Sequence, residues 1–96
     1  MDYQEKRKIL EQNGYIPLDF HPMLDPERYM INKKGEVVLV NLKNHLYQHL
    51  KPTQHKKLND SYYKLTALNG MTSRCYIKDL LREQKEYNEM IGRVWE

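Results

Sequence analysis

The sequence is poor in the residues on which several protein classes depend. Its single cysteine, Cys75, excludes an internal disulfide and a paired-thiol metal or redox site. The only serines, Ser61 and Ser73, do not lie in a Gly-x-Ser-x-Gly nucleophile motif. The four glycines are isolated, so there is no glycine-rich phosphate-binding loop. We therefore expect a binding protein rather than an enzyme, and we predict no cofactor.

Long hydrophobic runs are also absent. The first ten residues are charged and lack the apolar stretch of a signal peptide, and no run approaches the ~18 apolar residues that span a bilayer. Together with the lone cysteine, this predicts a protein of the reducing cytoplasm that has no membrane partner. The 96 residues suit one domain, 1–96, with one modest core.

Tyrosine and positive charge are abundant, and the charge is unevenly distributed. There are eight Tyr but only one Phe and one Trp, and tyrosine serves equally in half-buried strands and in recognition surfaces. Residues 1–28 carry four basic and six acidic side chains, residues 29–78 nine basic and two acidic, and residues 79–96 three basic and five acidic. The basic middle is either a solvated lysine-rich region or a face that binds phosphates.

Local signals divide the chain into a helix, an extended segment and two hairpins. We expect a helix over Asp2–Asn13, within segment 1–14, stopped by Asn13-Gly14, and an extended segment over Tyr15–Arg28 because three prolines exclude a helix or a central strand. Each hairpin has a glycine at its turn. The first joins Tyr29–Ile31 to Glu36–Val40 through Gly35, and the second joins Ser61–Leu68 to Met71–Tyr76 through Asn69-Gly70.

The hydrophobic period changes from two to about 3.6 at Ile77. This predicts a C-terminal helix over 77–94 whose apolar stripe covers a sheet. The stripe comprises Ile77, Leu80, Leu81, Gln84, Tyr87, Met90, Ile91 and Val94. The predicted fold is α+β: a small antiparallel β-sheet of two hairpins within a β-rich core (15–81), covered by the C-terminal helix, with a short N-terminal helix.

The cations of the basic middle are interleaved with tyrosines. Lysines position a nucleic-acid backbone and rings stack on exposed bases, so the mixture suits sequence-tolerant DNA binding. The candidate binding residues are Lys33, Lys34, Lys51, Lys56, Lys57, Lys64, Arg74, Tyr62 and Tyr63.

Three histidines lie in the 41–58 segment, whose secondary structure the sequence leaves open. In a helix, His45 and His49 would share one face, with His55 six residues further on. Surrounding lysines oppose a metal dication, so surface histidines are the favoured interpretation and no metal site is predicted. A metal-dependent phosphodiesterase built on these histidines is the enzymatic alternative.

A series of short motifs runs in order along the chain: Phe20–Met23, Tyr29–Val37, Leu50–Pro52, Ser61–Leu65 and Ile77–Leu81. This order resembles the modular DNA-binding domain found beside HNH homing endonucleases in phages and mobile elements, over about two thirds of the chain. Glu36 replaces a basic residue of that pattern and Lys78 replaces a histidine, and no HNH nuclease segment follows Leu81. The resemblance implies the DNA-binding module without the nuclease, in the host-cell cytoplasm if the chain is phage-encoded.

The alternative of a different class is a phage-encoded protein–protein inhibitor of a host defence nuclease, for example an anti-CRISPR protein. The acidic residues Glu83, Glu86 and Glu89 would then face the basic channel of the nuclease. Residues 1–14 pack either on their own core or on a second subunit, so a homodimer stays open. Trp95 is either a partner anchor or a packing residue.

Overall fold

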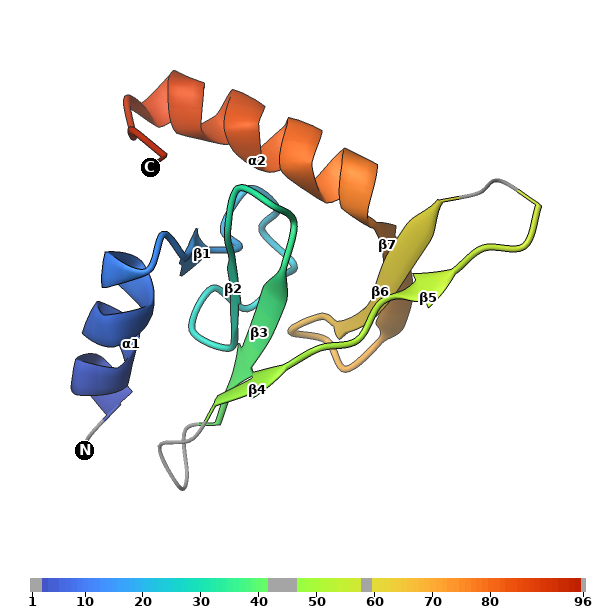
Figure 1. The fold of residues 1–96 in the computed structure, drawn as a ribbon, viewed down its shortest axis with the longest axis horizontal. Coiled ribbons are helices and arrows are strands. Elements are labelled where there is room, and N and C mark those ends of the chain that lie inside the picture. Colours follow the sequence, from blue (N-terminus) through green and yellow to red (C-terminus); the bar gives the residue numbers. More distant parts are fainter. Residues whose placement is uncertain (1–2, 42–46, 58–59, 96) are drawn as a thin grey trace.

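The chain folds into two helices and two antiparallel sheets, and the predicted α+β class is confirmed (Figure 1). The computed structural model describes residues 3–41, 47–57 and 60–95. The elements are α1 (Tyr3–Gln12), β1 (Ile16–Pro17), β2 (Tyr29–Ile31), β3 (Val37–Val40), β4 (Tyr47–His49), β5 (Thr53–Gln54), β6 (Ser61–Thr66), β7 (Thr72–Tyr76) and α2 (Ile77–Ile91). Both predicted hairpins form, but they lie in separate sheets of order β1-β2-β3-β4 and β5-β6-β7.

Helix α1 ends where the sequence predicts. Gly14 adopts a left-handed φ of 88°, and the side-chain Nδ2 of Asn13 donates a 2.7 Å hydrogen bond to the carbonyl oxygen of Ile9. Leu10 is the buried residue of this helix. It packs with residues of the first sheet, so α1 lies on that sheet of its own chain.

The β2–β3 hairpin is shaped by its polar turn. Oδ1 of Asn32 accepts hydrogen bonds from the backbone N–H groups of Lys34 and Glu36, at 3.1 and 2.9 Å. Gly35 has a φ of 85° and is buried. The hairpin therefore begins and ends within a residue of the prediction, with β3 starting at Val37 rather than Glu36.

Proline limits the strands on either side of this hairpin. Pro17 lies in β1, the edge strand of the sheet, as its missing N–H requires. β4 ends at His49, three residues before Pro52, which has no N–H to continue a strand ladder. His49 lies in a strand, so the segment whose secondary structure the sequence left open is extended there. His45 lies outside the described residues.

The β2–β3 hairpin of the first sheet is buried on both faces, whereas β4 is exposed. Met30 and Val38, which pair across β2 and β3, pack with Leu10 of α1. Their neighbours Ile31 and Val37 point to the other face and join the larger core. Burial on both faces explains why β2 and β3 are continuous apolar runs rather than alternating ones.

The second sheet packs against α2 through one of its faces. Along β6 and β7, the residues Tyr63, Leu65 and Cys75 share the larger core with Leu80 of α2. The Asn69-Gly70 turn closes the hairpin, with Gly70 at a φ of 85°. The opposite face of this sheet, turned away from α2, carries the alternate residues.

The predicted extent of the C-terminal helix and its apolar stripe is wrong in the last turn. Gly92 takes the left-handed C-cap conformation and ends the helix at Ile91, so the stripe does not continue to residue 94. Met90 and Val94 are 74% and 80% exposed. The polar residues Gln84 and Asn88 are buried on the core side instead. Neither helix among the described residues has the length and apolar character needed to cross a bilayer.

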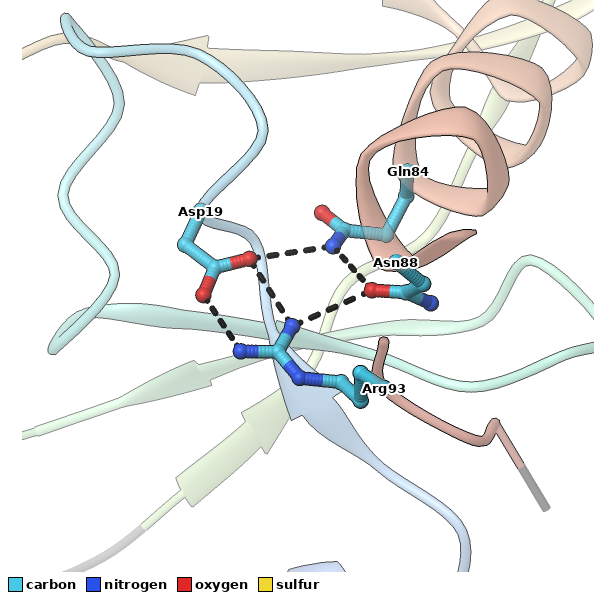
Figure 2. Close-up of polar contacts among 4 residues, drawn as sticks. All are labelled: Asp19, Gln84, Asn88 and Arg93. Carbon is cyan, nitrogen blue, oxygen red and sulfur yellow. Dashed lines mark hydrogen bonds and ion pairs between the residues drawn. The ribbon is translucent and has the colours of Figure 1, made fainter. Parts of the chain in front are cut away.

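The buried end of α2 is polar because it binds the segment after β1. Arg93 forms a two-pronged ion pair with Asp19, and Gln84 bridges Asp19 to Asn88 (Figure 2). Burial alone would raise the pKa of the Asp19 carboxyl, but hydrogen bonds from Arg93 and Gln84 and the charge of Arg93 outweigh it, so the pKa lies below its ordinary value of 3.8. This network anchors the chain after Gly92.

Candidate nucleic-acid interface

The outer face of the second sheet brings cations together across its strands. Lys64 on β6 pairs directly with Arg74 on β7, and both side chains are exposed. The pairing of Thr53 with Tyr62 sets the register of β5. Because neighbouring strands are about 5 Å apart, Lys64 and Arg74 form a short row of two cations across the sheet. Lys51, which is exposed and precedes β5 by two residues, adds a third cation near this edge of the sheet.

Aromatic rings lie next to this row. The guanidinium carbon of Arg74 lies 5.2 Å from the ring centre of Tyr62. The ring of Tyr62 is 5.5 Å from that of Tyr76, and the ring of Tyr76 is 6.2 Å from that of His55. A continuous series of rings therefore runs from Arg74 to the loop after β5. We call Lys51, Lys64, Arg74, Tyr76 and His55 the outer face.

The loop after β5 adds two lysines beside His55. The backbone N–H of Lys57 donates a 3.1 Å hydrogen bond to Nδ1 of His55, which fixes the turn that carries Lys56 and Lys57. Both lysines are exposed. The loop thus extends the positive charge beyond the Tyr76 end of the ring series.

Acidic side chains are nearly absent from this region. Asp60 is the only acidic residue of the sequence between Glu36 and Asp79. Its carboxylate lies 3.5 Å from the ammonium group of Lys78, which compensates its charge. The strands β5, β6 and β7 therefore present cations without carboxylates.

The remaining predicted lysines lie elsewhere. Lys33 and Lys34 are exposed in the β2–β3 turn. Lys33 lines a hollow with Leu81 and Lys85 of α2, whereas Lys34 lines another with residues of the β4–β5 connection. The structure thus gathers Lys51, Lys56, Lys57, Lys64 and Arg74 around one sheet and places Lys33 beside α2.

Two of the predicted stacking tyrosines are buried. Tyr62 and Tyr63 are 7% and 4% exposed. Arg74 lies over the ring of Tyr62, and the hydroxyl of Tyr63 donates to the carbonyl oxygen of Gly35 in the core. Neither ring presents an open face to a base in this structure, and their role in binding stays a prediction. Tyr76 is the partly exposed ring of the series, and its pairing with Tyr62 in the hairpin register is the signal that would have identified it.

Cys75 does not have the surroundings of a nucleophile. Burial, and secondarily the charge of Glu83, raise the pKa of its thiol, which disfavours the reactive thiolate. His21 lines the same hollow of about 310 Å³, but its Nδ1 accepts a hydrogen bond from the backbone N–H of Met23. Cys75 Sγ contacts the carbonyl oxygen of Ser73 at 3.8 Å. This geometry is that of a structural thiol.

Metal-ligating side chains do not cluster within the described ranges. No group of three His, Cys, Asp or Glu residues has a metal-binding arrangement there. His49 lies on β4 in the first sheet and His55 follows β5 in the second, so the sheet division separates them. His45, the third histidine of the hypothetical site, falls within 42–46, outside the described residues.

In comparisons with known proteins, no family model, curated protein or solved structure matches this chain. The resemblance to the HNH-associated DNA-binding domain accordingly stays a prediction based on the short motifs alone.

Proposed function

We propose that this protein binds DNA through the outer face of its second sheet, mainly by contacts with the phosphate backbone. The observation that carries the proposal is the direct cross-strand pairing of Lys64 with Arg74 on a face whose strands contain no carboxylate. Like charges at directly opposed positions of a sheet destabilise it. A phosphate between the two side chains would turn this repulsion into two attractions.

The ring series supports the same proposal. Packing of Arg74 on Tyr62 holds the guanidinium group at the face and restricts its side-chain freedom. A cation that is already positioned loses less entropy when it binds a phosphate. Lys56 and Lys57 lie in a turn fixed by His55 and would extend the contact along the backbone.

The test is fluorescence anisotropy of labelled DNA at several salt concentrations. The double variant Lys64→Gln/Arg74→Gln should bind about 10-fold more weakly and should reduce the slope of log affinity against log salt by about 2. The matched control is Lys8→Gln/Lys85→Gln, which removes two exposed cations from α1 and α2. Equal losses in both double variants would contradict a specific role for the outer face.

A protein partner is the second proposal, and an exposed apolar group favours it. Met90, Ile91 and Val94 are all exposed around the end of α2, close in sequence to the exposed Glu86 and Glu89. An apolar patch rimmed by charge is typical of protein–protein contact. In this proposal the protein is an inhibitor that occupies the basic channel of a host nuclease with its acidic helix.

Inhibition distinguishes the two proposals. A purified CRISPR effector should lose DNA cleavage at stoichiometric amounts of the protein. The variant Glu83→Gln/Glu86→Gln/Glu89→Gln should restore cleavage, whereas Lys64→Gln/Arg74→Gln should not. If the protein slows cleavage only in proportion to the DNA that it covers, DNA binding accounts for the effect.

A further inference from the structure

We infer that the nucleic acid that fits the outer face is single-stranded, with a base stacked on Tyr76 and its backbone along the row of Lys64 and Arg74. The inference rests on the proposed DNA binding and specifies the form of DNA. It depends on where the rings lie relative to the cations, and on which elements carry positive charge.

The outer face offers a ring beside its cations. Tyr76 pairs with Tyr62 across the strands, one step of two residues from the Lys64–Arg74 pair. Its ring is partly exposed and lies between Tyr62 and His55, at 5.5 and 6.2 Å. Bases in a duplex present only their edges, whereas an unpaired base presents a flat π-face to such a ring.

The spacing of the cations allows contact with one strand. Lys64 and Arg74 lie on neighbouring strands about 5 Å apart. Their long side chains can reach successive phosphates of the same strand, and the ring beside them is what distinguishes a single strand from a duplex. A base attached to that backbone then lies over the neighbouring row of the sheet, where Tyr76 is located.

The helices do not offer the alternative of insertion into a duplex groove. α2 packs on the inner face of the second sheet through Leu80, and its exposed side carries Glu83, Glu86 and Glu89. If α2 entered a groove of a duplex, these carboxylates would lie beside the phosphates of the groove walls and would be repelled by them. In α1 the cations Lys6 and Arg7 lie over the rings of Tyr47 and Tyr3. The cations that pair across strands, Lys64 and Arg74, thus lie next to rings on a face that neither α1 nor α2 covers.

The experiment compares a labelled oligothymidine with a duplex of the same length, by anisotropy under identical salt. We expect the single strand to bind at least about 10-fold more tightly. Tyr76→Ala should weaken single-strand binding by about 5-fold or more, with little change in the salt slope, while Tyr76→Phe should retain binding because it keeps the ring. Tyr47→Ala, which removes an exposed ring of the first sheet, is the control and should have no effect.

A second readout separates stacking from an effect on folding. A 5-iodouracil oligonucleotide irradiated on the protein should crosslink to Tyr76 or His55, as mapped by mass spectrometry. Duplex binding as tight as single-strand binding, or a crosslink confined to α1 or the first sheet, would overturn this inference and leave DNA binding intact. If neither form of DNA binds at low salt, the proposed function itself fails.

Discussion

The phenolic oxygen of Tyr63 donates a 3.0 Å hydrogen bond to the backbone carbonyl oxygen of Gly35. Tyr63 belongs to β6 in the second sheet and Gly35 to the β2–β3 turn of the first, so this bond joins the two sheets. Gly35 also lies against α2, since a β-carbon at this position would be 2.5 Å from Cγ2 of Ile77. Both sheets and the C-terminal helix therefore meet at a residue without a side chain.

Gly35→Ala should destabilise the fold by about 2–5 kcal/mol. Its left-handed φ of 85° costs an alanine about 1–2 kcal/mol, and the clash with Ile77 adds a further overpacking cost of about 1–3 kcal/mol. The control is Gly70→Ala, which has the same φ but no atom within 4 Å, and should lose only the backbone cost. Urea denaturation gives both values, and equal losses would show that Gly35 does not fix the contact with α2.

Tyr63→Phe should cost about 1–2 kcal/mol, because the buried carbonyl oxygen of Gly35 loses its hydrogen bond while the ring packing remains. Thermal and urea unfolding report the loss. Tyr47→Phe is the matched control, since the hydroxyl that it removes belongs to an exposed residue at the edge of the first sheet. An unchanged stability of Tyr63→Phe would mean that packing alone joins the sheets.

Stability should fall at alkaline pH as buried tyrosines ionise. Burial, followed by the charge of Glu36, raises the pKa of Tyr15 above 10.0, and burial also raises that of Tyr63. A raised folded-state pKa gives stability that is fully present below pH 10.0 and is lost as the pH rises through the folded value. Absorbance at 295 nm should show tyrosines that titrate late, and Tyr63→Phe should reduce the alkaline loss of stability.

Asp19→Asn should destabilise the protein by about 1–3 kcal/mol at neutral pH, because Arg93 loses the carboxylate that it binds at 2.8 Å in a partly buried site. The lowered pKa of Asp19 gives stability that is present above 3.8 and is lost as the pH falls through the lower folded-state value. The variant should thus show a shallower loss between neutral and acid pH. Glu86→Gln, exposed on α2, is the control and should follow the parent chain.

Cys75 should react slowly with Ellman's reagent in the folded protein at pH 7.5, at least about 10-fold slower than in the urea-unfolded chain. Burial raises the pKa of its thiol, and the side chain contributes to the larger core. The comparison of the two rates in the same preparation is its own control. A folded rate equal to the unfolded rate would place the thiol at the surface.

Sequence patterns predicted both helices and both hairpins because those signals are local, but they did not predict the short strands β1, β4 and β5. Asn13-Gly14, Asn32–Gly35 and Asn69-Gly70 each fix a turn through a left-handed glycine, and the structure has all three. The prediction failed at Gly92, the fourth glycine. The helical spacing of Met90 and Val94 led us to extend the helix past this glycine, although the chain stops the helix there. The burial of the polar side chains Gln84 and Asn88 depends on their hydrogen bonds with Asp19 and Arg93. A local pattern does not show this, because Asp19 lies 65 residues before Gln84.

Composition and spacing determined by themselves that the chain forms two hairpins between two helices and that positive charge concentrates in its middle. Only the tertiary structure decided which of the interleaved tyrosines are buried, which lysines share a face, and that the hairpins form two sheets. Turn signals act over a few residues, whereas the face that a strand presents depends on what packs against it. Tyr63 turns inward because Gly35 and α2 lie there, and Lys64, its neighbour in the chain, therefore turns outward beside Arg74.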